Sequence, residues 1–84
     1  MAIETTEYLR GMLPRMIRAA GRRVGDADPE DLVDLVALRD EVDAAIASAI
    51  RGQRERHGRS WAEIARGLGT SRQAVQMRYG QTNR

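Results

Sequence analysis

The 84-residue sequence predicts an all-α protein of four to five helices, in which a long central helix precedes a C-terminal helix-turn-helix. Apolar residues recur at helical spacing along most of the chain, and no alternating pattern indicates a strand. Glycines and capping residues divide these stretches, and the chain is short enough to form a single domain over residues 1–84. Its expected parts are an N-terminal helix in 1–25, a long helix in 28–57 and a helix-turn-helix in 60–80.

The N-terminal helix is expected from about Thr5 to Val24. Its apolar side chains fall at intervals of three and four residues and form one continuous stripe. They are Leu9, Met12, Leu13, Met16, Ile17 and Ala20. Pro14 interrupts this stripe, because proline lacks a backbone donor and its ring clashes with the carbonyl of Arg10. We therefore expect either a kink near Gly11 or a second helical piece that starts at Pro14.

The long helix has a strong start signal, since Asp28 is a good N-cap and Pro29 suits the first helical position. No stop signal occurs before Gly52 or Gly58, so the helix is expected to reach about His57. Its apolar stripe consists of Leu32, Leu35, Val36, Val42, Ala45, Ile46, Ala49 and Ile50.

The beginning of the long helix is apolar on almost every side. A helix of this kind is buried on more than one side, and the N-terminal helix can cover only one. A second copy of the chain would cover the other, so we expect a homodimer. The expected dimer interface consists of Leu32, Val33, Leu35, Val36 and Leu38. The alternative is a kinked N-terminal helix that wraps both faces within a monomer.

Residues 60–79 have the spacing of a helix-turn-helix. Three apolar residues share a face of the first helix and a fourth points back from the second, namely Ile64, Ala65, Leu68 and Val75. Gly69 provides the left-handed turn that ends the first helix, and Ser71 caps the second. We expect Trp61 to pack against Val75 or Tyr79; the alternative is an indole N–H that donates to a DNA phosphate.

The outward face of the second helix suits contact with DNA bases. Arginine pairs bidentately with guanine and glutamine with adenine in the major groove. The expected base-reading residues are Arg72, Gln73, Gln76 and Met77, and the expected phosphate contacts are Arg59, Ser60, Arg66, Ser71 and Arg78. The alternative is a helix-turn-helix that serves only for packing, with arginines that face solvent.

Bacterial transcription regulators contain a helix-turn-helix that resembles the pattern Ile64-Ala65-x-x-Leu68-Gly69-x-Ser71-x-x-x-Val75-x-x-Arg78. The pattern is especially similar to the sigma-factor module that reads the −35 promoter element. Trp61 and the run 71–75 also resemble small helix-turn-helix proteins of actinobacteria and their phages. The resemblance covers about the last third of the chain. It implies transcription-type recognition of double-stranded DNA, with Arg72, Gln73 and Gln76 as readers.

The net charge of +2 is distributed unevenly along the chain. Residues 1–25 carry +3, residues 26–50 carry −7 and residues 51–84 carry +6. We expect the basic C-terminal part to face DNA, and the acidic segment to face away from phosphate or toward another protein.

Two functions of different classes follow from these patterns. The favoured one is sequence-specific binding of double-stranded DNA by a transcriptional regulator. The alternative is a protein-interaction module or adaptor whose acidic long helix binds RNA polymerase, a sigma factor or a toxin. We expect no enzymatic activity, because the sequence offers no Ser/His/Asp or Cys/His set and no phosphate-binding loop.

The same composition argues against metals, cofactors and membranes. The chain has no cysteine and a single histidine, His57, so we expect neither a metal site nor a cofactor. No apolar run approaches the roughly 18 residues that a membrane span needs, and the N-terminus lacks the features of a signal peptide. A cytoplasmic, nucleoid-associated protein is therefore expected.

Overall fold

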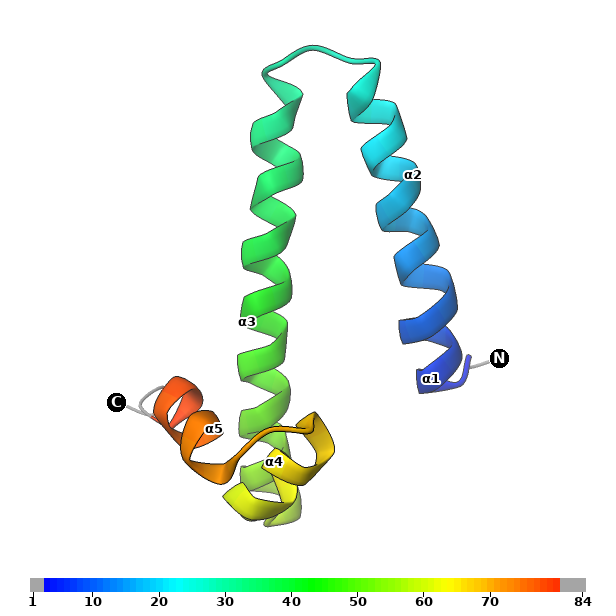
Figure 1. Cartoon of the computed structure of the whole chain (residues 1–84). Helices are drawn as coiled ribbons and strands as arrows, with labels where there is room; N and C mark the ends of the chain where they lie inside the picture. Colours follow the sequence, from blue (N-terminus) through cyan, green and yellow to red (C-terminus); the bar gives the residue numbers. More distant parts are fainter. Residues whose placement is uncertain (1–2, 81–84) are drawn as a thin grey trace. The chain divides into compact units, whose positions relative to one another are not determined.

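The computed structural model describes residues 3–80, whose regular structure is entirely helical (Figure 1). The elements are α1 (Thr5–Glu7), the π-helical turn η1 (Tyr8–Met12), α2 (Leu13–Gly25), α3 (Asp31–His57), α4 (Trp61–Leu68) and α5 (Arg72–Tyr79). The predicted all-α fold with a long central helix is thereby confirmed. Residues 1–2 of the predicted N-terminal segment and residues 81–84 of the predicted domain lie outside the described residues.

The chain divides into two compact units, and the division falls inside α3. The N-terminal unit, Met1–Arg39, contains α1, η1, α2 and the beginning of α3. The C-terminal unit, Asp40–Arg84, contains the rest of α3 together with α4 and α5. The predicted helix-turn-helix therefore belongs entirely to the C-terminal unit.

The chain passes Pro14 without leaving the helix. The ribbon is continuous from α1 to α2, and the turn between them is the π-helical η1 (Figure 1). There the backbone N–H of Leu13 donates to the carbonyl of Tyr8, five residues back. This shift places Pro14 in the first turn of α2, where a missing N–H costs least. The sequence allowed either a kink near Gly11 or a second helical piece that starts at Pro14. The structure is nearer to the second alternative, since α2 begins at Leu13.

The start of α3 differs from the prediction. Asp28 does not cap the helix with its carboxylate; instead its backbone N–H donates to the carboxylate of Asp31 over 3.2 Å. Three successive bonds of the i→i+3 type join residues 28–30 to residues 31–33. The first turn is thus tight, as is common at helix N-termini, and α3 begins two residues after Pro29. Its other end, His57, lies where the sequence predicts it.

No residue between 3 and 39 is buried. In η1 and α2, the first part of the apolar stripe is open to water, and Met16 is 60% exposed. Of the five residues predicted at a dimer interface, Leu35 alone is half-buried, and Val33 is 69% exposed. Leu35 borders a shallow hollow with Ala20 and Val24 of α2, beside the turn that joins α2 to α3. The N-terminal unit consequently has no closed core of its own.

The C-terminal unit has a small core made by all three of its helices. The buried members are Ile50 of α3, Ile64 and Ala65 of α4, and Val75 of α5. Ile46, Trp61 and Tyr79 pack around them. The predicted inward positions Ile64, Ala65 and Val75 are thus confirmed, whereas Leu68 is 53% exposed. An eight-residue helix has only two turns, and the inward side of α4 is already occupied by Ile64 and Ala65.

Gly69 ends α4 in a left-handed conformation, with φ of 73°. The N–H of Gly69 donates to the carbonyl of Arg66, and the N–H of Thr70 donates to the carbonyl of Ala65. These two bonds form a Schellman motif, which satisfies carbonyls that the end of a helix would leave unpaired. Backbone hydrogen bonds at a left-handed glycine therefore close the end of α4 and begin the turn to α5.

Two glycines two residues apart test this turn. Gly69→Ala is expected to lower the free energy of unfolding by about 1–2 kcal/mol, because a side chain disfavours the left-handed conformation. Gly67→Ala is the matched control: Gly67 lies inside α4 with open space around its Cα, so alanine is expected to raise stability by about 0.5–1 kcal/mol. Urea unfolding of both variants measures the difference, and a Gly69→Ala protein as stable as the wild type would contradict this account.

Candidate nucleic-acid interface

The helix α5 is held at its start and along one side. The hydroxyl oxygen of Ser71 accepts a bond of 3.1 Å from the backbone N–H of Ala74, which confirms the predicted N-cap. Val75, only 2% exposed, packs α5 against α4 through Ile64 and Ala65. Because the cap and the packed side fix the rotation of the helix, its opposite face is presented in one orientation.

All four predicted base readers are exposed. Gln73 and Met77 are four residues apart and so lie on the same side of α5, away from Val75. Arg72 and Gln76 have the same spacing and lie beside them. Met77 is 70% exposed. The structure thus brings the predicted reading residues onto one continuous face.

The predicted phosphate contacts fall into three groups. Arg78 belongs to α5 and lies over the ring of Tyr79, with 5.7 Å from its guanidinium carbon to the ring centre. Arg59 and Arg66 border a groove between α3 and α4. The two serines are exposed helix caps. In these caps the serine oxygen is the acceptor, so the hydroxyl proton is still available to donate to an anion.

The corner between α3 and α4 contains a hydrogen-bonded cluster that the sequence did not suggest. Arg59 Nη1 donates to Gln53 Oε1 over 2.7 Å, and Arg54 Nη1 donates to the carbonyl of Arg59 over 3.2 Å. Gly58, with φ of 62°, provides the left-handed turn that ends α3 and begins this corner. A search for a glycine followed by an N-cap would have found the corner, but not the polar side chains that bridge it.

Trp61 begins α4 and packs against the buried core, as predicted, but it is only half-buried. The guanidinium of Arg54 lies over its ring, with 4.4 Å from the guanidinium carbon to the ring centre. A cation over an indole face is attracted by the negative charge of the ring's π-system. Trp61 therefore stabilises the junction of α3 and α4 through two kinds of contact.

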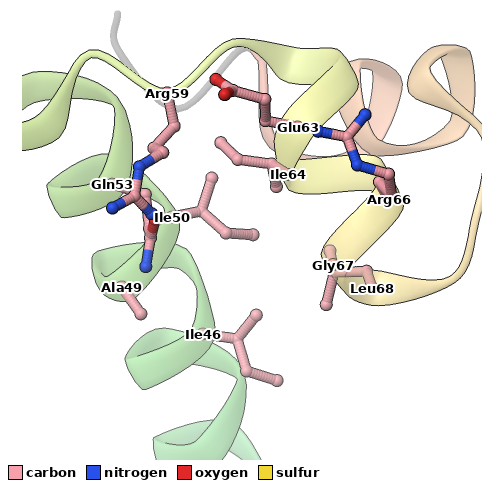
Figure 2. A pocket seen from close by; sticks show the side chains of 10 residues that line it. All are labelled: Ile46, Ala49, Ile50, Gln53, Arg59, Glu63, Ile64, Arg66, Gly67 and Leu68. Carbon is pink, nitrogen blue, oxygen red and sulfur yellow. The ribbon is translucent and has the colours of Figure 1, made fainter.

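The groove between α3 and α4 has a volume of about 630 Å³, and Figure 2 shows the side chains around it. Its apolar lining comes from both helices and includes Ile46, Ile50 and Leu68. Gln53, Arg59, Glu63 and Arg66 supply the polar rim. No base-reading residue of α5 lines the groove, so the C-terminal unit carries two distinct surfaces.

Glu63 at the groove rim also completes the cap of α4. Its carboxylate accepts a bond of 2.8 Å from the backbone N–H of Ser60, and its own N–H donates to the Ser60 hydroxyl oxygen over 3.1 Å. The backbone N–H of Ser60 is the main reason that the pKa of the Glu63 carboxyl lies below its usual value. Slight burial opposes this, whereas the Ser60 hydroxyl and the charges of Arg59 and Arg66 add to it.

The described residues contain no group of three or more His, Cys, Asp or Glu side chains placed to hold a metal ion. No helix among residues 3–80 is long and apolar enough to cross a membrane. The chain matches no protein-family model, no curated protein and no solved structure. Its function must therefore be argued from the geometry and charge of its own surfaces.

Replacing Trp61 tests its structural role. Because the indole is half-buried, Trp61→Ala is expected to cost about 1–3 kcal/mol, less than the roughly 3–5 kcal/mol of a fully buried tryptophan. Trp61→Phe retains a ring beneath Arg54 and should recover part of the loss. Thermal unfolding measures both variants. Unchanged stability combined with lost DNA affinity would show instead that the indole serves the ligand.

The Glu63 cap predicts a pH dependence of stability. Its pKa is lowered on folding, so its contribution is fully present above the unfolded value and is lost as the pH falls through the lower folded value. Glutamine accepts the same bond but does not titrate in this range, which makes Glu63→Gln the matched control. The difference in melting temperature between wild type and Glu63→Gln should shrink from pH 7 toward pH 3. A constant difference would contradict the assignment.

Proposed function

We propose that this protein is a sequence-specific, double-stranded DNA-binding protein that regulates transcription through its C-terminal helix-turn-helix. The main support is the exposed face of α5, where Arg72, Gln73, Gln76 and Met77 lie together on a helix whose rotation is fixed by its cap and by Val75. A recognition helix needs this combination, because base edges are read only by side chains held at defined positions in the major groove.

Charge supports the same proposal. Residues 51–84 contain eight arginines against two glutamates, and one of these glutamates, Glu63, is occupied in the cap of α4. Arg59, Arg66 and Arg78 are all exposed and belong to the segments around α4 and α5. Arginines that flank a reading helix would hold the phosphates on either side of it and so fix its register on the duplex.

We propose further that the active species is a homodimer associated with the bacterial nucleoid or a phage genome. One helix of eight residues offers few base contacts, and regulators of this size commonly read two half-sites with two recognition helices. The resemblance of the motif Ile64–Arg78 to sigma-factor and small phage helix-turn-helix modules favours a role at promoters.

The second candidate is a protein-interaction module, with RNA polymerase, a sigma factor or a toxin as possible partners. The groove between α3 and α4 favours it, because the groove is apolar at its base and charged at its rim. The acidic segment of α3 offers another surface that phosphate would repel. The two candidates are compatible, since an activator can hold DNA with α5 and a protein with the other surfaces.

Alanine substitutions distinguish base readers from phosphate contacts. Arg72→Ala and Gln76→Ala are each expected to cost about 1–3 kcal/mol on the preferred site and to relax preference at one position. Arg78→Ala should weaken all sequences alike and reduce the slope of log affinity against log salt by about one unit. Selection from random duplexes supplies the site, and fluorescence anisotropy at several salt concentrations supplies the affinities.

Arg18→Ala is the matched control, because Arg18 is an exposed arginine of α2, outside the helix-turn-helix. Removing the Arg18 side chain should change neither the sequence preference of the protein nor its affinity for the selected duplex. If Arg72→Ala and Gln76→Ala behave like this control, α5 is not a recognition helix, and the protein-interaction module becomes the better proposal.

A further inference from the structure

Met77 lies at the middle of the exposed face of α5. Val75 packs α5 against α4, and Gln73 and Met77 are each two residues away from it in the sequence. At about 3.6 residues per turn, this spacing sets both side chains about 160° around the helix axis from Val75. Arg72 and Gln76 are turned about 60° and about 100° from Val75, so they lie on the flank of the same face. When α5 lies in a major groove with α4 behind it, Gln73 and Met77 are therefore the side chains nearest the base edges.

The Met77 side chain does not contribute to the protein core. It is 70% exposed, and among the described residues it belongs neither to the buried core of the C-terminal unit nor to the side chains packed against that core. Its neighbours one turn earlier on α5 are Gln73 and Ala74, which are both exposed as well. The thioether end of Met77 is therefore open to a ligand that approaches α5 from outside.

The chemistry of methionine limits what Met77 can recognise. Its sulfur is a weak acceptor and the side chain has no donor, so it cannot form the bidentate hydrogen bonds by which arginine and glutamine read bases. Against a base edge that offers only donors and acceptors, Met77 would exclude water from those groups without replacing their hydrogen bonds. The major groove presents one apolar group, which is the C5-methyl of thymine.

We propose that Met77 reads a thymine by packing against its C5-methyl group. The inference rests on the proposed recognition of DNA by α5, and it adds the base and the chemical group that one of the readers selects. The contact removes apolar surface of both partners from water and needs neither a charge nor a hydrogen bond. Met77 therefore contributes to the sequence preference of the protein without contributing to the salt dependence of binding.

Uracil tests the contact, because it is thymine without the C5-methyl group and has the same hydrogen-bonding edge. In the duplex that the wild-type protein selects, each thymine is replaced by uracil one at a time, and fluorescence anisotropy gives the affinities. Loss of one methyl contact is expected to weaken wild-type binding about fourfold at one of these thymines. Met77→Ala should bind the selected duplex more weakly than the wild type, and uracil at that thymine should weaken it no further.

Two variants control for other causes of weaker binding. Met77→Leu keeps an apolar side chain at the same place and should retain most of the preference for thymine over uracil. Arg78→Ala removes a proposed phosphate contact of the same helix, so it should weaken both duplexes alike and leave their affinity ratio unchanged. Because Met77 is 70% exposed and uncharged, Met77→Ala should keep the wild-type melting temperature and the wild-type slope of log affinity against log salt.

The outcomes separate this inference from the proposed function. A protein that selects no duplex from a random pool would overturn the recognition of DNA by α5, and the reading of thymine with it. A selected site without thymine, or one that tolerates uracil at every thymine, would overturn the reading of thymine by Met77 alone. An effect of uracil that Met77→Ala retains would assign the methyl contact to another side chain, and so would also overturn the inference.

Discussion

The close packing of α4 on α5 is the contact on which the candidate interface depends. Ala65 permits the two helices to approach, Val75 fills the space between them, and Gly69 lets the backbone reverse within a few residues. A larger residue at position 65 would separate the helices, and a side chain at position 69 would strain the turn. Each change would rotate or tilt the exposed face of α5 without touching any residue that is proposed to read DNA.

The two units meet the need to bury apolar surface in different ways. The C-terminal unit closes a core with only four buried side chains, and its helix ends are paired by the caps of Ser60 and Ser71 and by the Schellman turn at Gly69. The N-terminal unit contains the 13-residue α2, which is longer than α4 or α5, but it has no buried residue among 3–39. Helix length alone therefore adds little stability, because most of the stability of a helix comes from the packing of its apolar face.

Local signals in the sequence accounted for most of the fold. The glycine at 69, the serine at 71 and the spacing of Ile64, Ala65 and Val75 placed α4 and α5 correctly, because each acts within a few residues. The sequence did not predict features in which neighbouring residues compete for the same backbone hydrogen bonds. Pro14 predicted an interruption of the helix but not that the interruption would be a π turn. Asp28 was expected to cap α3 with its carboxylate, but in the tight first turn the Asp31 carboxylate accepts a bond from the backbone N–H of Asp28 instead.

Contacts across the chain were the least predictable part of the candidate site. The bonds among Gln53, Arg54 and Arg59, and the stacking of Arg54 on Trp61, join residues that come together only when Gly58 turns the chain. These contacts occupy arginine side chains, and one of them, Arg59, was expected from the sequence to contact phosphate. Because the Arg59 guanidinium already donates to Gln53, a DNA phosphate would compete with that bond. We therefore expect Arg59 to contribute less than Arg78 to the salt dependence of DNA binding.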